Sequence, residues 1–132
     1  MIHLDTYAAM KPVRPQAHSD DLSRWLSQRP GIPVLIEVEL MRATWRSAPD
    51  RAARAPDVVR GIGVVTLSPA VIARAAGYPD PDQRSLDAVR LATAEHVVFV
   101  TQEALTAFVA YDERLLAAAR DAGLPVGAPG LA

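Results

Sequence analysis

The sequence predicts an α/β fold, a three-layer α/β/α arrangement around a central parallel sheet of four to five strands. Two observations support this: short β-type runs alternate with helical segments, and helix-capping residues follow several of these runs. Strands that alternate with helices form right-handed crossovers, which give a parallel sheet covered on both faces. With 132 residues and 50% hydrophobic content, the chain has the size of one compact unit, so we expect a single domain over 1–132.

The N-terminal part of the chain is predicted to contain a strand and two helices. Residues 1–5 favour a strand, and residues 6–11 can form a helical turn capped by Asp5 or Thr6. Residues 19–28 have leucine and tryptophan at helical spacing and two aspartates in the first turn, which is typical of an amphipathic helix.

The middle of the chain gives one ambiguous and one clear pattern. Residues 34–45 mix apolar residues with helix formers, so a helix is favoured, although 34–38 alone also fit a strand. The polar stretch 51–60 is predicted to be helical in part. Residues 61–67 form a glycine-bounded β-type run, and a serine N-cap with a proline at the first helical position predicts a helix over 70–76.

The C-terminal part continues the alternation. Residues 85–98 predict a second clear helix, and residues 106–111 predict an interior strand that ends just before Asp112. Residues 113–122 predict a helix closed by a glycine, and 125–127 leave room for a last short strand.

Two acidic residues follow predicted strands far apart in the chain. Asp5 ends the first strand and Asp112 follows the strand at 106–111. In parallel sheets, ligands bind outside the carboxyl ends of the strands. Each acid alone fits a turn or a helix N-cap, but together they indicate a site at one edge of the sheet.

Asp87 is predicted to lie on the buried face of its helix. It shares a helical stripe with Leu91, Ala94 and Val98. A buried carboxylate needs a cation, a hydrogen-bond donor or a metal, since burial alone favours the protonated form. The alternative is that Asp87, in the first turn after Ser85, serves the helix dipole or the cap.

Periodicity does not decide which of two neighbouring glutamates points inward. Glu39 shares a stripe with apolar residues, but Glu37 also lies near apolar residues on the opposite side. A solvated Glu39 could pair with Arg42 at i+3, which is a good helical spacing.

A carboxylate cluster at the end of a sheet suits Mg²⁺ or Mn²⁺. These hard cations prefer carboxylate and water oxygens and need few protein ligands. Such a metal activates water and neutralises charge in phosphodiester hydrolysis. His3, His18 and His96 lack the spacing of metal ligands, so we interpret them as structural or solvated.

Amino-acid composition and net charge limit the functions that the protein can have. The net charge of -1 does not point to a polyanion partner, although 13 of the 14 basic residues are arginine, which suits phosphate recognition. Without cysteine, the chain has no disulfide, thiolate metal site or cysteine nucleophile. No export signal or membrane span is apparent, so we expect a soluble cytoplasmic protein with no membrane partner.

Four segments resemble motifs of the PIN-domain ribonucleases, and specifically the VapC toxins of type II toxin–antitoxin systems. The similarity covers almost the whole chain. The segments are Met1-Ile-His-Leu-Asp5-Thr6, Val38-Glu39-Leu-Met-Arg-Ala43, Ser85-Leu-Asp87-Ala-Val-Arg-Leu-Ala-Thr-Ala94 and Leu105-Thr-Ala-Phe-Val-Ala-Tyr-Asp112-Glu-Arg-Leu-Leu. The resemblance favours Glu39 over Glu37.

The resemblance implies a PIN-like fold and a Mg²⁺- or Mn²⁺-dependent endoribonuclease that cuts tRNA or rRNA. Its metal-binding and catalytic residues would be Asp5, Glu39, Asp87 and Asp112, with Thr6 supporting them. It also implies a homodimer and inhibition by a cognate VapB-like antitoxin. Arg14, Arg42, Arg46 and Arg90 are our candidates for the RNA backbone, with solvated ion pairs as the alternative.

Several positions depart from the family pattern. Tyr7 and Ala110 replace small hydroxyl residues that help to orient ligands, Gln16 replaces a frequent acid, and Arg90 replaces a frequent histidine. These departures leave an alternative open, in which a catalytically weakened PIN scaffold binds RNA or an antitoxin. A phospho-accepting, flavodoxin-like domain is disfavoured because it needs a lysine after a late strand, and the single lysine is Lys11. Trp25 and Trp45 fit core, dimer or antitoxin contacts better than base stacking.

Overall fold

We describe the chain in a computed structural model. Glu39, Arg14, Gln16 and the stretch 51–60, on which predictions were made, lie outside the described residues. The structure describes residues 1–11, 17–28, 33–35, 42–46, 49–50, 63–64 and 67–131.

Within the described residues, five short parallel strands form one sheet. Their order across the sheet is β3-β2-β1-β4-β5, so β1 lies in the centre. This confirms the predicted parallel α/β architecture. The strands are β1 (Ile2–Leu4), β2 (Pro33–Leu35), β3 (Gly63–Val64), β4 (Ala107–Val109) and β5 (Val126–Gly127).

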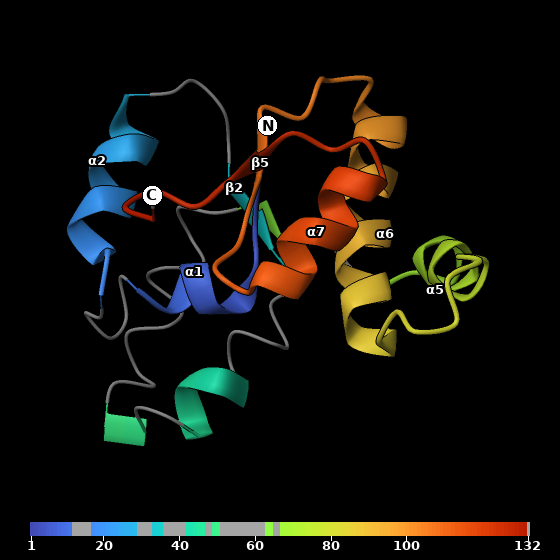
Figure 1. Cartoon of the computed structure of the whole chain (residues 1–132), viewed down its shortest axis with the longest axis horizontal. Helices are drawn as coiled ribbons and strands as arrows, with labels where there is room; N and C mark the ends of the chain where they lie inside the picture. Colours follow the sequence, from blue (N-terminus) through green and yellow to red (C-terminus); the bar gives the residue numbers. More distant parts are fainter. Residues whose placement is uncertain are drawn as a thin grey trace.

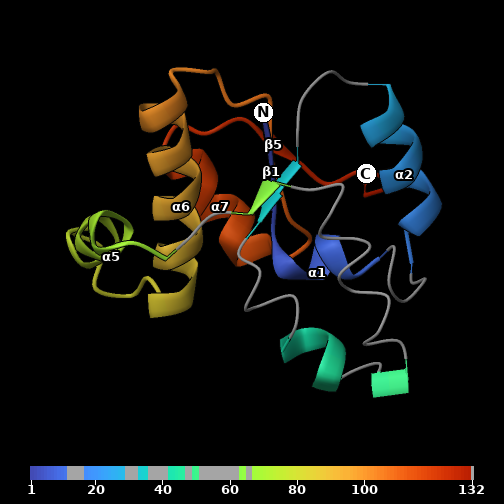
Figure 2. The same cartoon turned by 180° about the vertical axis from the view of Figure 1, so that it is seen from behind.

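Helices cover both faces of this sheet. In Figures 1 and 2, α1 and α2 lie on one side of the strands, α6 and α7 lie on the other, and α5 packs outside α6. The helices predicted at 6–11, 19–28, 70–76, 85–98 and 113–122 are confirmed, and α6 extends about one turn beyond its predicted end. The helices are α1 (Thr6–Met10), α2 (Ser19–Ser27), α5 (Pro69–Ala76), α6 (Ser85–Thr101) and α7 (Glu113–Asp121), with a further helical turn at 42–46.

The strand period of two residues divides the core into two clusters. Ile2 and Leu4 face α1 and α2, together with Ala107 and Val109 of the neighbouring strand. Phe108 faces the opposite way, where it packs with apolar residues of α6 and α7. Because both faces are buried, the central strands contain almost no polar residues.

The predicted helix over 34–45 is wrong at its beginning. Pro33–Leu35 forms β2, which pairs in parallel with β1 on one side and β3 on the other. A short run of apolar residues does not by itself distinguish a strand in a parallel sheet from a segment of helix, which is why local sequence favoured a helix here. Residues 42–46 are helical, as predicted for this end of the segment.

The order of the strands creates a switch point between β1 and β4. The chain proceeds from β1 outward to β2 and β3, and then returns to the other side of β1 with β4 and β5. Helices α1 and α7, which follow β1 and β4, therefore leave on opposite faces of the sheet (Figure 1). Open α/β sheets bind ligands beside such a point, at the carboxyl ends of the strands. Among the described residues, no helix is long and apolar enough to cross a membrane.

Candidate active site

Asp5 is fixed at the carboxyl end of β1. Its backbone N–H donates to the carbonyl of Val109 at 2.9 Å, which extends the pairing of β1 with β4. Its carboxylate caps α1, because Oδ1 accepts a hydrogen bond from the Ala8 backbone N–H at 2.8 Å. The side chain is buried, at 5% exposed. The strand-to-helix junction therefore holds a carboxylate beside the switch point.

Asp112 occupies the equivalent position after β4. It is the N-cap of α7, where Oδ1 accepts hydrogen bonds from the backbone N–H groups of Arg114 at 2.9 Å and Leu115 at 3.2 Å. The Leu115 hydrogen bond is the largest cause that lowers the pKa of Asp112, against the opposing effect of desolvation. The Arg114 hydrogen bond and the charges of Arg114 and Arg84 lower it further. Asp112 is thus held in its ionised form.

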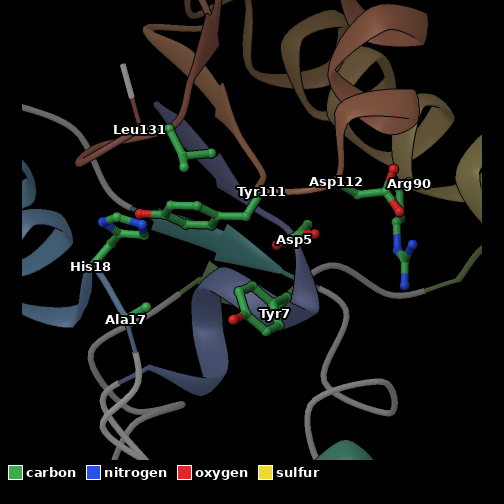
Figure 3. Close-up of a pocket in the computed structure, with 8 residues that line it drawn as sticks. All are labelled: Asp5, Tyr7, Ala17, His18, Arg90, Tyr111, Asp112 and Leu131. Atoms are coloured by element: carbon green, nitrogen blue, oxygen red, sulfur yellow. The ribbon is translucent and has the colours of Figure 1, made fainter.

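These two carboxylates line one cavity of about 550 Å³ (Figure 3). Its volume is in the range of small-molecule sites. Arg90 of α6 lines the same cavity and brings a positive charge to it. The remaining lining residues are Tyr7, Ala17, His18, Tyr111 and Leu131.

Aromatic rings line the part of the cavity away from Asp112 (Figure 3). Tyr111 lies parallel to His18, with 6.0 Å between the ring centroids, and edge-on to Tyr7 at 5.9 Å. Burial raises the pKa of Tyr111 to about 12, with the nearby carboxylates of Asp21 and Asp5 acting in the same direction. Its hydroxyl therefore stays protonated and donates to the carbonyl of Pro129 at 2.9 Å.

Lys11 lies buried behind this aromatic group. Its ammonium is 4.4 Å from the ring centroid of Tyr111 and 4.8 Å from that of Tyr7, and it donates to the carbonyl of Ala17. Burial lowers the pKa of Lys11, and the negative charge of Asp5 opposes this change. Lys11 thus connects α1, both tyrosines and the segment before α2.

Asp87 is buried, as its apolar stripe predicted, but it faces a cation. Its Oδ1 lies 3.0 Å from Nη1 of Arg90, one turn along α6. Asp87 lines a separate cavity of about 210 Å³, which Arg84 and Arg114 also line. The Asp87–Arg90 ion pair therefore joins the linings of the two cavities, since Arg90 lines the first and Asp87 the second.

The predicted site residues are thus only partly brought together. Asp5 and Asp112 share a cavity, Asp87 is directed to Arg90, and Glu39 lies outside the described residues. Within the described part of the chain, no three acidic or histidine side chains are close enough to hold a metal ion. The four-carboxylate cluster stays a prediction, and so does the supporting role of Thr6, whose side chain is outside the description.

Of the predicted RNA-contacting arginines that the structure describes, Arg90 lines the cavity and the other two do not. Arg42 and Arg46 are exposed on the helical turn 42–46, and Arg14 lies outside the described residues. Trp25 packs against the first core cluster, as predicted, whereas Trp45 is exposed.

Sequence reasoning missed the aromatic part of the cavity. Tyr111 was detectable, because it directly precedes Asp112 at the end of a buried strand. Tyr7 was noted only as a departure from the family pattern, and Lys11 only as the single lysine. His18 was interpreted as structural or solvated, whereas it lines the cavity. No local sequence pattern predicts the contact between His18 and Tyr111, because the two residues are far apart in the chain.

Comparison with solved structures defines the class. The fold resembles the crystal structure of Mycobacterium tuberculosis VapC20, a toxin described as cleaving the sarcin–ricin loop. The two agree with a TM-score of 0.65 over 89% of this chain and 95% of that chain, at 17% sequence identity. No family model matches the sequence. The chain thus has the fold of this toxin, with acidic residues at the switch point of its sheet.

Full-length relatives then identify the family. Ribonuclease VapC35 of Mycobacterium tuberculosis is 40% identical over 136 aligned residues, which cover 100% of this chain and 99% of the relative. Ribonuclease VapC47 of the same species is 34% identical, and the alignment covers 98% of each chain. The chain belongs to the VapC family of toxins, which confirms the resemblance inferred from its acidic motifs.

Proposed function

We propose that this chain is the toxin of a type II toxin–antitoxin pair and an endoribonuclease that hydrolyses RNA phosphodiester bonds with Mg²⁺ or Mn²⁺. The single observation that supports this most is the pair Asp5 and Asp112, which cap two helices at the switch point and line one cavity. The full-length relatives named as ribonucleases support the same reaction class.

The donor chemistry of the two residues fits the proposed metal. Carboxylate oxygens are the preferred ligands of Mg²⁺ and Mn²⁺, and one or two carboxylates suffice when waters and substrate phosphates complete the shell. Asp5 and Asp112 would hold the metal, with Glu39 and Asp87 as the further predicted ligands. When bound, it supplies Lewis-acid stabilisation of the phosphate and a water of lowered pKa.

The chain's own residues contribute orientation and charge. Backbone hydrogen bonds to Oδ1 hold both carboxylates in place, so no rotamer freedom is lost when they act. Arg90 can supply charge to a phosphate on the cavity side while it neutralises Asp87. Approach of a polyanion to a cavity with two carboxylates otherwise meets repulsion, which Arg90 reduces.

The proposed partners follow from family membership. We propose tRNA or rRNA as substrate, a cognate VapB-like antitoxin as inhibitor, and a homodimer as the assembly. The description of VapC20 as a sarcin–ricin loop cleaving toxin supports cleavage within a loop as one target class.

Induced expression followed by mapping of new RNA ends tests this proposal. The wild type should arrest growth and create discrete RNA ends, and co-expression of the antitoxin should prevent both. Asp5→Asn keeps an amide oxygen for the α1 cap but removes the negative charge that would bind the metal. It should therefore abolish the new RNA ends. Growth arrest with the same ends in wild type and Asp5→Asn would refute the assignment.

A second function is supported by the ion pair of Asp87. Because Asp87 faces Arg90, and Tyr7 and Ala110 replace hydroxyl residues, the scaffold could bind RNA or an antitoxin with little turnover. Titration of the purified protein with Mn²⁺ separates the two functions. Specific Mn²⁺ binding that Asp5→Asn weakens supports the nuclease, whereas RNA binding without any Mn²⁺ binding supports the binding module.

A further inference from the structure

The cavity at the switch point has two walls of different chemistry (Figure 3). Asp5, Asp112 and Arg90 form a charged wall. We call the other the aromatic wall and define it by Tyr7, Tyr111 and His18. The proposed hydrolysis uses only the charged wall, so the aromatic wall needs its own explanation.

The aromatic wall is held in a fixed arrangement. The hydroxyl of Tyr111 is anchored on the carbonyl of Pro129, and its ring stacks on His18 at an interplanar angle of 4°. The Lys11 ammonium contacts both tyrosine rings from the buried side. A preorganised wall loses little conformational entropy when a ligand binds.

Tyr7 is not a packing residue in this arrangement. It contacts Tyr111 and Lys11, yet 47% of its surface is exposed and it borders the cavity. A large aromatic ring half in contact with a fixed cluster and half open to a cavity can accept a second flat group on its surface.

Each strand end supplies one carboxylate together with one tyrosine. Asp5 and Tyr7 follow β1, and Tyr111 and Asp112 follow β4. At each strand end the carboxylate and the tyrosine are therefore only one or two residues apart, and the chain spans at most about 3.5 Å per residue. An occupant of the cavity must thus present an anion and a flat group within a short distance, as a nucleotide does with its phosphate and base.

We propose that the aromatic wall is a nucleobase subsite, in which the half-exposed ring of Tyr7 takes an unpaired base of RNA, Tyr111 and His18 hold the wall in place, and the adjoining phosphate faces the charged wall. This inference rests on the proposed function, since it names the part of the RNA that the site recognises. An unpaired base is required because bases within a helix cannot present their faces to a ring. Aromatic stacking accepts any base, so the subsite selects single-stranded RNA rather than a sequence.

An aromatic side chain of a protein partner is the competing occupant. It fits the aromatic wall equally well, but it provides no phosphate for Arg90 and for the metal proposed at Asp5 and Asp112. A nucleotide satisfies both walls at once, which favours RNA.

Binding of single-stranded oligoribonucleotides in EDTA tests the subsite without requiring cleavage. The probes are short homopolymers of adenosine, cytidine and uridine and a ribose–phosphate chain of equal length without bases. Tyr7→Ala should weaken binding of the homopolymers about 5- to 150-fold, the usual effect of losing one base–aromatic stack. Binding of the base-free chain should not change, and Tyr7→Phe should bind as the wild type does.

Phe99→Ala is the matched control, because Phe99 is an exposed aromatic residue at the far end of α6, outside this cavity. It should leave every Kd unchanged. The subsite is refuted if the wild type binds none of the homopolymers, or if Tyr7→Ala weakens the homopolymers and the base-free chain equally. The subsite is also refuted if the Tyr7→Ala variant binds RNA as the wild type does. If that variant instead loses binding to a protein partner, the aromatic wall is a protein-binding surface. Tyr7-dependent binding by a protein that shows no metal-dependent cleavage would support the subsite while refuting the nuclease.

Discussion

Replacement of His3 by phenylalanine should remove a pH dependence from the stability of this fold. His3 lies in β1 at 1% exposed, stacked on Phe108 with 4.7 Å between ring centroids. Its Nδ1 has no hydrogen-bond partner among the described residues. Burial, together with the positive charge of Arg90, lowers the pKa of His3 from 6.5 to about 3. The folded protein therefore holds a neutral imidazole.

The size of the effect follows from proton linkage. In the unfolded chain His3 regains its ordinary pKa of 6.5, so below this pH the unfolded state binds a proton that the folded state does not. The contribution is fully present above pH 6.5 and is lost as the pH falls towards about 3. At about 1.4 kcal/mol per pH unit, His3 should lower the free energy of unfolding by about 2 kcal/mol between pH 7 and pH 5.

Urea unfolding, followed by tryptophan fluorescence at several pH values, measures this contribution. His3→Phe should be at least as stable as the wild type at pH 7, since an apolar ring of similar shape replaces a buried group with an unpaired nitrogen. The difference should widen by about 2 kcal/mol at pH 5. His96→Gln, a change on the partly exposed side of α6, should keep the dependence that His3 creates. Equal losses of stability in the wild type and His3→Phe between these pH values would refute the burial argument.

Three further substitutions test other contacts by urea unfolding. Arg90→Ala leaves Asp87 buried without its cation and should lower the free energy of unfolding by about 2–4 kcal/mol. The double variant with Asp87→Ala should recover part of that loss. Equal stability of the single and double variants would contradict the pairing. Asp112→Ala removes the α7 cap and should cost about 1 kcal/mol, while Asp112→Asn keeps a cap oxygen and should cost less; an equal loss in the two variants would show that charge, not capping, dominates. Lys11→Met keeps the stem but removes the ammonium over two rings, and should cost about 1–2 kcal/mol; unchanged stability would mean that these contacts contribute nothing.

Much of the fold was predictable because local signals agreed with the tertiary structure. Ser68 accepts a hydrogen bond from the Val71 N–H and begins α5 where the sequence predicted, and Gly123 adopts a positive φ after α7. The buried positions Asp87, Leu91 and Ala94 of α6 were also predicted, whereas Val98 of the same predicted stripe is only partly buried. These elements are determined by residues within a few positions of one another.

The errors concern properties that depend on distant parts of the chain. Residues 33–35 become a strand because β1 and β3 lie on both sides, which local sequence cannot show. The aromatic wall depends on the contact between His18, which precedes α2, and Tyr111, which follows β4, two positions far apart in the chain. Arg90 was predicted to contact RNA, but its i+3 spacing from Asp87 could have identified the ion pair directly.

The most direct test of the account is RNA cleavage by the purified protein across a Mn²⁺ titration, compared among the wild type, Asp5→Asn and Asp112→Asn. Asp82→Asn, an exposed acid in the loop before α6, is the matched control. We predict cleavage by the wild type and Asp82→Asn that EDTA abolishes, and a loss of at least about 100-fold in both site variants, since removal of a group that stabilises the transition state has effects of this order. Cleavage that persists in EDTA, or that Asp5→Asn and Asp112→Asn leave intact, would contradict the assignment of these carboxylates.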